Sequence, residues 1–435
     1  MFGIQNIVFI LLLAVATVLF IKNVRKIARN IRLGREIKRN DQKAARWKIM
    51  AKVALGQQKM TTRPIAALLH LFVYVGFVII NIEVLEILLD GILGTHRIFA
   101  PILGNFYNFL IGSFEILALL VLIGVVVFMI RRNILNIKRF QQSDLDGWPK
   151  SDANYILIAE IFLMSAFLLM NAADAALQEK SVSHYIQAGS FPISSFIKPL
   201  LDNCSTSFLI IFERFLWWFH IIGILVFLNY LPYSKHFHII LAFPNVWYSN
   251  LDSKGRFGNM ESVKNEVKLM LDPTAVVPEN PLPEKFGAKD VQDLTWKNLL
   301  DAYTCTECGR CTSECPANIT GKKLSPRSIM MKTRDRLEEV GKNLDKNKGV
   351  FLPDGKSLLH DHITPEELWA CTSCNACVQA CPVNIDPLSV IIDLRRQLVM
   401  EESNPPSSLG SMFNNVQNNG APWQFSPADR LNWTE

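Results

Sequence analysis

Long runs of apolar residues dominate the first 240 positions of this 435-residue chain. A helix needs roughly 20 apolar residues to cross a bilayer. Five runs reach about that length, at 3–21, 64–89, 106–130, 154–176 and 207–231. The pattern therefore predicts five transmembrane helices.

Basic residues lie almost entirely on one side of these runs. Residues 22–63 hold fourteen Lys or Arg against two acidic residues, and four more basic residues lie in 131–139. The opposite loops, near 91–105 and 178–206, hold three basic residues in all. The positive-inside rule then predicts an outer N-terminus and a cytoplasmic location for everything after Lys235. We expect a multi-pass protein of the cytoplasmic (inner) membrane.

The first run resembles a signal peptide only in its position. It lacks a basic segment before its apolar core and a small-residue cleavage site before Lys22, so we expect a retained helix. The basic segment 24–52 follows, with Ile27 and Ile31 at helical spacing. Two interpretations stay open for it: a basic helix lying on anionic headgroups or on a partner, or a charged loop that only sets the topology.

The net charge of +6 is the sum of two unequal parts. Residues 22–63 contribute +12 and the rest of the chain −6. A basic excess confined to one loop is explained by membrane topology, so we expect no nucleic-acid partner. The charged fraction of 19% also lies below that of typical soluble proteins.

Three histidines are candidate ligands of b-type haem: His70, His220 and His238. Imidazole in an apolar helix is costly and usually functional, and paired imidazoles from two helices are how a bundle binds haem iron. The alternative is a set of polar histidines that are satisfied inside the bundle. On a continuous helix, His220 and His238 would share one face about 27 Å apart. Pro232 predicts a bend between them, and His236 is expected at headgroup level.

The run His220-x11-Pro232-Tyr233-Ser234-Lys235-x2-His238 resembles the last helix of the gamma-type cytochrome b subunit of respiratory nitrate reductase. The similarity covers roughly residues 1–240 and includes the five-helix count. In that family two haems each bridge the second and fifth helices, and the second helix carries two histidines ten residues apart. Here the second position is Ile80. The resemblance implies one haem on His70 and His238, and it leaves open a second haem or a single haem on His70 and His220.

Two carboxylates, Glu83 and Glu86, lie deep in the second apolar run. Ionisable residues within a membrane are costly and often functional. Two interpretations stay open for them: protonation of a quinone, or a structural role at the outer interface.

Eight of the nine cysteines form two copies of one motif. Cys305-x2-Cys308-x2-Cys311-x3-Cys315-Pro316 recurs as Cys371-x2-Cys374-x2-Cys377-x3-Cys381-Pro382. Three thiolates spaced by two residues wrap three irons of a [4Fe–4S] cubane, and the fourth serves the other cluster. The spacing predicts one cluster on Cys305, Cys308, Cys311 and Cys381, and a second on Cys371, Cys374, Cys377 and Cys315.

Structural zinc is the competing interpretation of these cysteines. Zinc sites favour two CxxC pairs and make no use of a third CxxC step or of a Cys-Pro ending. The ninth cysteine, Cys204, lies in an outer loop, and we expect it to be inert.

The chain around the motifs is predicted to be helical. Helices are expected over 290–303 and 323–339, from the Thr364 capping box onward, and from Pro387 to Glu401. The predicted fold class is all-α, with a five-helix transmembrane bundle and a cytoplasmic alpha-helical ferredoxin domain. The expected divisions are a cytochrome b-like domain (1–242), a linker (243–285), a ferredoxin domain (286–401) and a disordered or partner-binding tail (402–435).

Residues 285–401 resemble the alpha-helical ferredoxin of the small subunit of heterodisulfide reductases and of succinate dehydrogenase iron–sulfur subunits. Cys305-Thr-Glu-Cys-Gly-Arg-Cys311 and Gly321-Lys-Lys-Leu-Ser-Pro326 are especially similar to membrane-bound iron–sulfur oxidoreductases of the heterodisulfide-reductase-related group. In that group, tails similar to Gly420-Ala-Pro-Trp423 lead into a domain with paired-cysteine CCG motifs. No adjacent cysteine pair occurs in this sequence, so the resemblance implies a separate cytoplasmic CCG-type subunit that docks on the tail.

Together the two halves predict a membrane-anchored oxidoreductase subunit that passes electrons between a cytoplasmic partner and menaquinone or ubiquinone. Quinone reduction with electrons from an electron-transfer flavoprotein is the first hypothesis. The alternatives are quinol oxidation that feeds a heterodisulfide or sulfur-type reductase, and a membrane redox sensor or scaffold. No Gly-rich nucleotide fingerprint occurs, so direct NAD or flavin binding is not expected.

Overall fold

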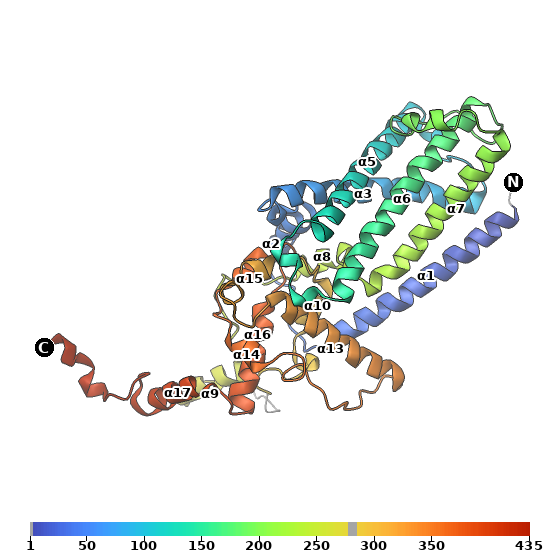
Figure 1. The fold of residues 1–435 in the computed structure, drawn as a ribbon. Helices are drawn as coiled ribbons and strands as arrows, with labels where there is room; N and C mark the ends of the chain where they lie inside the picture. The colour runs from blue at the N-terminus through green and yellow to red at the C-terminus, as the bar shows by residue number, and fades with distance from the viewer. Residues whose placement is uncertain (1–2, 277–284) are drawn as a thin grey trace.

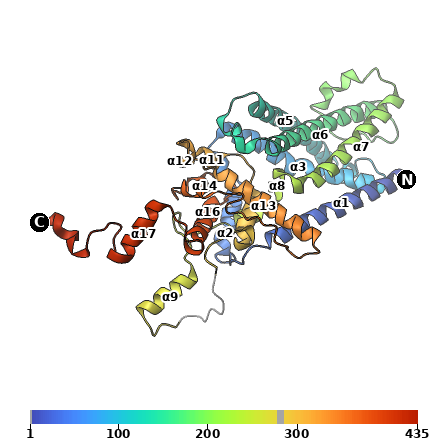
Figure 2. The same cartoon turned by 60° about the horizontal axis from the view of Figure 1, so that its bottom comes forward.

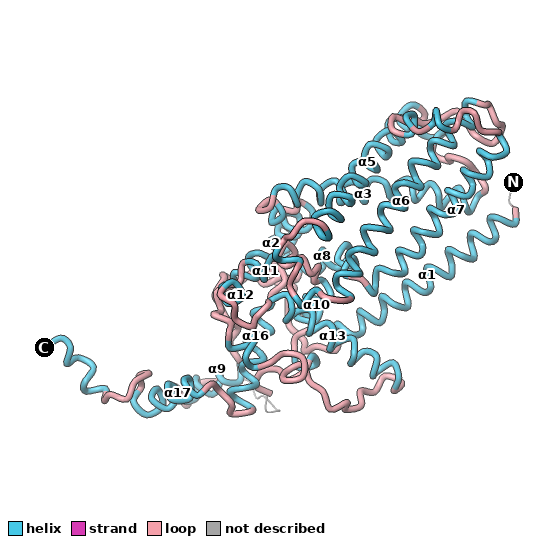
Figure 3. The backbone as a smooth tube through the Cα atoms, in the orientation of Figure 1, coloured by secondary structure: helices cyan, strands magenta, loops and turns pink. Residues whose placement is uncertain are grey.

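The computed structural model describes residues 3–276 and 285–435. Among these residues, five helices are long and apolar enough to cross a membrane: α1 (Ile4–Ile31), α3 (Pro64–Leu93), α5 (Asn105–Asn133), α6 (Trp148–Glu179) and α7 (Thr206–Tyr230). They lie side by side, and the cysteine-rich half gathers at one end of them (Figure 1). No strand occurs among the described residues (Figure 3). The predicted all-α class with a transmembrane bundle is confirmed.

The ends of the long helices follow local signals. α1, predicted over 3–21, continues to Ile31 through the basic residues that follow its apolar run. Pro64 is the first residue of α3, where a missing N–H costs no hydrogen bond. At the start of α7 the Ser205 hydroxyl accepts a hydrogen bond from the N–H of Phe208 at 3.2 Å.

Glycines let the long helices approach one another closely. A Cβ on Gly76 of α3 would lie 2.4 Å from Val121 of α5, and one on Gly91 would lie 2.6 Å from the ring of Phe9 of α1. Small residues serve this purpose in membrane bundles, where close van der Waals packing holds helices together. The helices close into a ring in the order α1, α3, α5, α6, α7, with α7 next to α1.

The fifth long helix ends before Pro232. α7 stops at Tyr230, short 3-10 turns follow at Leu231–Tyr233 and Lys235–Phe237, and α8 (His238–Trp247) begins afresh. Proline has no N–H to continue the helical ladder, so the bend that we predicted is a complete break. The continuous helix that would place His220 and His238 on one face is therefore not formed.

The basic segment 24–52 is divided rather than one helix. After α1 the chain turns and runs beside the cysteine-rich half, and α2 (Lys43–Met50) and a π-helical turn (Ala51–Leu55) follow. The N–H of Arg35 donates to the Leu294 carbonyl at 2.7 Å, and the N–H of Trp296 donates to the Arg35 carbonyl at 3.0 Å. Gly34 is required there, because a Cβ would lie 2.5 Å from the nitrogen of Trp296.

Basic side chains of the same segment also contact the cysteine-rich half and α8. Lys26 and Arg29 pair with Asp345 at 2.7 and 2.5 Å. The side chain of Arg46, only 1% exposed, donates to the Trp247 carbonyl at 3.0 Å. The segment therefore lies against another part of its own chain.

The cysteine-rich half consists of shorter helices. They are α10 (Trp296–Thr304), α11 (Arg310–Ser313), α12 (Pro316–Ile319), α13 (Pro326–Lys346), α14 (Pro365–Trp369), α15 (Ala376–Ala380) and α16 (Pro387–Arg396), with a π-helical turn over Gln397–Glu401. The capping box that predicted α14 is present: the N–H of Glu367 donates to the Thr364 hydroxyl at 3.3 Å, and the N–H of Thr364 donates to the Glu367 carboxylate at 2.9 Å. The helix predicted over 290–303 is a 3-10 turn followed by α10.

One hydrophobic core joins the two halves. Ile27 of α1 and Phe237 and Leu241 near α8 belong to the same buried cluster as Leu299 of α10 and Val340 of α13. The shorter helices accordingly pack onto the end of the bundle (Figure 2). This shared core fixes the cysteine motifs relative to the long helices.

Two helices lie away from this core. α9 (Glu261–Leu271) lies within the predicted linker 243–285, and α17 (Ser407–Asn419) lies in the predicted tail 402–435. Neither helix has a buried residue, and both project from the rest of the chain (Figure 2). Residues 277–284 of the predicted linker lie outside the described residues.

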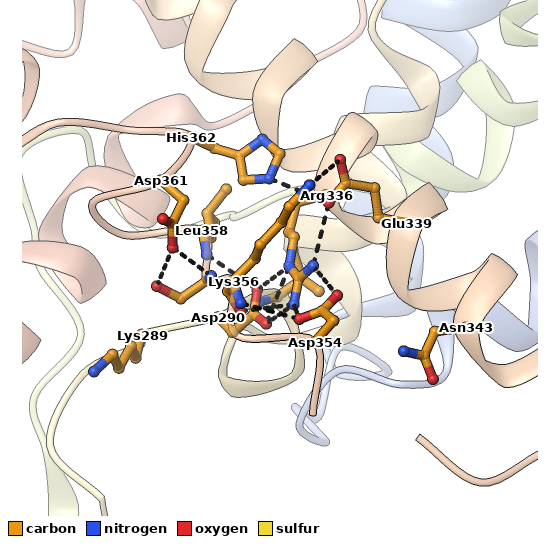
Figure 4. A network of polar contacts seen from close by, with 12 residues as sticks. Lys289, Asp290, Arg336, Glu339, Asn343, Asp354, Lys356, Leu358, Asp361 and His362 are labelled. Atoms are coloured by element: carbon orange, nitrogen blue, oxygen red, sulfur yellow. Dashed lines mark hydrogen bonds and ion pairs between the residues drawn. The ribbon is translucent and has the colours of Figure 1, made fainter. Parts of the chain in front are cut away.

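Arg336 of α13 holds several loops of the cysteine-rich half together. Its side chain is 0% exposed. The guanidinium donates to Asp290 at 2.7 Å, to Asp354 at 2.6 Å and to the Lys356 carbonyl at 2.9 Å (Figure 4). Asp290 also accepts from the N–H of Leu358 at 3.1 Å. One cation thus connects α13, the chain before α10 and the loop after α13.

Replacing this arginine is expected to destabilise the protein strongly. Arg336→Met removes one partner of a buried ion-pair network and should lower the free energy of unfolding by about 3 kcal/mol. Chemical denaturation of the full chain in detergent, followed by circular dichroism, measures the loss. Lys342→Met, an exposed cation on the same helix, is the control and should change it by less than about 0.5 kcal/mol. Equal midpoints for the two variants would contradict the structural role of Arg336.

Candidate metal centres

Four cysteines from both motifs surround one cavity. Cys305, Cys308, Cys311 and Cys381 line a space with an empty volume of about 340 Å³. Within residues 3–276 and 285–435, no three His, Cys, Asp or Glu side chains converge tightly enough to hold a single metal ion. The four thiols are spread around the cavity, and they are the set that the motif spacing groups together.

The remaining four motif cysteines also neighbour one another. Cys315 lies close enough to Cys371 and Cys377 for their thiolate charges to interact. Cys374 lies within the same kind of electrostatic range of Cys371. Cys315 and Cys377 are buried, whereas Cys374 is exposed. Each motif therefore sends its fourth cysteine toward the other motif. Crossed ligation requires this placement, and the ligation itself stays a prediction.

The two motifs bend their backbones in the same way. Glu307 and Gly309 have φ angles of 54° and 70°, and Ser373 and Asn375, at the same positions of the second motif, have 57° and 61°. Non-glycine residues adopt this left-handed conformation only at an energetic cost. Its repetition at equivalent positions indicates that the two loops are built for the same task.

Cys305, Cys311 and Cys381 of the first cavity resist ionisation in the absence of a cation. Burial raises the pKa of Cys381 to about 11 and the pKa of Cys305 to about 12. Burial, and then the charges of neighbouring thiolates, also raise the pKa of Cys311. Cysteine binds metal as the thiolate, so a positively charged iron centre would supply the missing compensation. The donor set therefore fits an iron–sulfur cluster.

A buried ion network connects the first motif to the bundle. Glu307 pairs with Lys235, which follows α7, and with Arg334 of α13 at 2.9 Å. Although burial opposes ionisation, these two cations hold the pKa of Glu307 below its usual range. The backbone N–H of Lys235 donates to Asp152 of α6 at 3.1 Å. The network holds the first cysteine loop against the end of the long helices.

The imidazole rings of all three candidate haem ligands are oriented by a hydrogen bond at Nδ1. In each, Nδ1–H donates to an oxygen: His70 to Oε1 of Gln57 at 3.0 Å, His220 to the Leu163 carbonyl at 3.1 Å, and His238 to the Lys235 carbonyl at 3.0 Å. An acceptor at Nδ1 leaves the lone pair on Nε2, which is the form of imidazole that binds iron. Each ring therefore fits an axial ligand.

The structure brings His70 and His238 together and places His220 elsewhere. His70 and His238 lie close enough for a charge on one ring to affect the other. His236 joins them, with its ring centroid 5.6 Å from that of His238. His220 packs on Phe167 of α6, with ring centroids 5.9 Å apart. Sequence reasoning assigned His236 to the headgroup level and missed this contact, which depends on the 3-10 turn after Pro232.

A second cavity lies at the opposite end of the bundle, with an empty volume of about 400 Å³. Its charged lining consists of Glu83, Glu86, Asp90, His96, Arg97, Asp174, Glu213 and Arg214. Arg97 donates to Asp174 at 2.6 Å and to the Tyr107 hydroxyl at 3.1 Å, while Oε2 of Glu83 has no partner. The sequence had indicated Glu83 and Glu86 but not Arg97 and Asp174, which are 77 residues apart.

Known proteins share the cysteine-rich half. Residues 304–385 match the 4Fe-4S dicluster domain. All eight motif cysteines lie within this dicluster domain. Iron–sulfur clusters are therefore supported independently of the cavity that the thiols surround.

Two similarities cover nearly the whole chain. It is 28% identical over 99% of its length to the probable iron-sulfur-binding oxidoreductase FadF of Bacillus subtilis, and it spans 60% of that protein. It is 27% identical over 92% of its length to the EtfAB:quinone oxidoreductase of Syntrophomonas wolfei, and it spans 55% of that protein.

A shorter similarity reaches a disulfide-reducing enzyme. Over 35% of the chain and 37% of the relative, the sequence is 24% identical to one component of the dihydromethanophenazine:CoB–CoM heterodisulfide reductase of Methanosarcina acetivorans. No solved structure matches the chain. The relatives are iron–sulfur oxidoreductases and a heterodisulfide reductase component, and they support electron transfer through a dicluster domain.

Proposed function

We propose that this protein is a membrane subunit that passes electrons between a cytoplasmic redox partner and the quinone pool. The route would consist of two [4Fe–4S] clusters and b-type haem. The observation that carries the proposal is the cavity surrounded by Cys305, Cys308, Cys311 and Cys381, at the same end of the bundle as His70.

The exposure and contacts of the two motifs indicate the order in which electrons would pass through the two clusters. Cys374 of the second motif is exposed, which makes that motif accessible to a soluble partner. The first motif is tied to the bundle through Glu307 and Lys235 and faces the long helices. When bound, the clusters and the haem supply one-electron chemistry. A soluble partner would therefore meet the second motif, and the membrane groups would meet the first.

The haem would be held by Nε2 of His70 and Nε2 of His238. Burial lowers the pKa of His238, so this ring is neutral at physiological pH and keeps its lone pair. The carbonyl of Lys235 and the amide oxygen of Gln57 fix the orientation of the two rings. His220 lies apart from this pair and would serve a second haem.

We infer quinone reduction as the direction. A relative that covers 92% of this chain is named for EtfAB and quinone. Electrons would enter from an electron-transfer flavoprotein or a separate CCG-type iron–sulfur subunit on the cytoplasmic side. Menaquinone or ubiquinone would be the acceptor, and the helices α1, α3, α5, α6 and α7 would anchor the protein in the inner membrane.

Stopped-flow spectroscopy tests this proposal. The full chain in lipid nanodiscs is reduced with dithionite, and a water-soluble menaquinone analogue is added. We expect the haem absorption bands and the cluster signals to return to the oxidised state after mixing. A redox sensor or scaffold need not be re-oxidised, so unchanged spectra would contradict the proposal. Reduction by menaquinol without re-oxidation by the quinone would instead favour the quinol-oxidising alternative.

A further inference from the structure

A short segment lies between the cysteine motifs and the start of α3. We call residues 56–63 the connector. Gln57 has a φ of 48°, a left-handed conformation that a non-glycine residue adopts at an energetic cost. The hydroxyl of Thr61 donates to the Gln58 carbonyl at 2.8 Å, and the N–H of Met60 donates to the Gln57 carbonyl at 2.8 Å. The connector is therefore a defined turn with its own hydrogen bonds.

One side of the connector contacts the loops around the first cavity. Nζ of Lys59 donates to the carbonyl of Cys381 at 3.1 Å and to the carbonyl of Val378 at 3.3 Å. Arg310 lies between Cys308 and Cys311, and its guanidinium donates back to the Lys59 carbonyl at 2.9 Å. The ammonium group thus fixes the one cysteine that must reach the cavity from the other motif. Its positive charge also stabilises negative charge on that thiolate.

The other side of the connector contacts the first candidate haem ligand. Oε1 of Gln57 accepts a hydrogen bond from Nδ1–H of His70 at 3.0 Å. Such an acceptor orients a metal-binding imidazole and raises its basicity. Gln57 and Lys59 are two residues apart, so a single turn contacts both the imidazole and the cysteine loop.

We propose that the connector positions the two redox groups against each other, with Gln57 orienting His70 and Lys59 holding the Cys381 loop. The first cluster, and not the second, is then the direct electron partner of the haem. This inference rests on the proposed function, because it requires both groups to be present. It goes further by assigning positioning roles to two residues that are not ligands themselves.

Two substitutions of Gln57 test the contact with His70. Gln57→Leu removes the acceptor, lowers the basicity of the imidazole and should raise the midpoint potential of the haem. Gln57→Glu supplies a stronger acceptor and should lower it. Spectroelectrochemical titration of the full chain in nanodiscs measures both shifts. Gln58→Leu, at the exposed neighbouring position, is the control and should leave the potential unchanged.

Lys59→Met tests the contact with the cysteine loop. It removes a cation beside Cys381, so the midpoint potential of the first cluster, followed by electron paramagnetic resonance, should fall. Because the Cys381 loop is then no longer held in position, electron transfer from the clusters to the haem after rapid reduction should slow roughly 10-fold. Lys59→Arg keeps the charge and the donors and should restore most of the rate. Lys52→Met removes a cation just before the connector and should change neither quantity.

The outcomes separate this inference from the proposed function. If both Gln57 variants keep the wild-type haem potential while haem and clusters are present, the connector does not position His70 and the inference is wrong. If Lys59→Met transfers electrons at the wild-type rate, the coupling to the first cluster is wrong. In both cases the proposed electron route still stands. If the wild-type chain contains no haem, the proposed function and the inference fall together.

Discussion

Replacing His70 by alanine is expected to remove b-type haem and to leave both iron–sulfur clusters in place. His70 is the candidate ligand that α3 contributes, it lies within electrostatic range of His238, and its Nδ1–H donates to Gln57, which leaves the lone pair on Nε2. Bis-histidine haem depends on both axial ligands, so loss of one should reduce haem content to a small fraction. The clusters should persist because their cysteines belong to a separate group of helices. Pyridine haemochrome absorption and iron content of the purified protein measure the two cofactors separately.

Three further histidine variants sharpen this result. His184→Ala, in the loop between α6 and α7, is the control and should retain haem. His238→Ala should reproduce the loss, whereas His220→Ala should do so only if a second haem or a His70–His220 pair exists. Unchanged haem in His70→Ala would overturn the ligand assignment. Haem loss in His220→Ala but not in His238→Ala would show that the pairing with His238 is wrong.

Replacing Cys315 by serine is expected to damage the cluster of the second motif more than the cluster of the first. Cys315 belongs to the first motif in sequence, but it lies beside Cys371 and Cys377 in space. The spacing rule for twin motifs makes the same assignment, since the fourth thiolate serves the other cluster. Electron paramagnetic resonance of the reduced protein should show one intact [4Fe–4S] signal and loss of about half the cluster iron.

Two comparisons decide whether the crossed scheme holds. Cys381→Ser is the reciprocal variant and should damage the first-motif cluster, because Cys381 lines the cavity with Cys305. Cys204→Ser, which alters the lone cysteine outside the motifs, should leave both signals unchanged. If Cys315→Ser removes only the first-motif cluster, each motif binds its own cluster and the crossed scheme is wrong.

His70→Ala and Cys381→Ser together test whether the transmembrane half and the cysteine-rich half are independent modules. His70 and Cys381 both contact the connector, at Gln57 and Lys59. Removing either cofactor should therefore shift the spectrum of the other slightly without abolishing it. Such a shift is expected from the Cys381→Ser and His70→Ala variants but not from Cys315→Ser, whose side chain lies on the second-motif side.

The sequence by itself determined the elements whose signals are local. A long apolar run specifies a membrane-spanning helix because the bilayer requires every backbone polar group to bond within the segment. The capping box at Thr364 specified the start of α14, since its hydrogen bonds join residues three positions apart. The cysteine spacing grouped the eight thiols because cubane geometry depends on short loops.

Only the tertiary structure decided which of these elements meet. Lys59 and the Cys381 carbonyl are 322 residues apart, so no local pattern predicts their contact. The approach of His236 to His238 and the packing of the basic segment on the cysteine-rich half have the same cause. Each depends on how apolar surfaces from both halves are buried in one core. Local chemistry specified the helices and the candidate ligands, and long-range packing brought the ligands together.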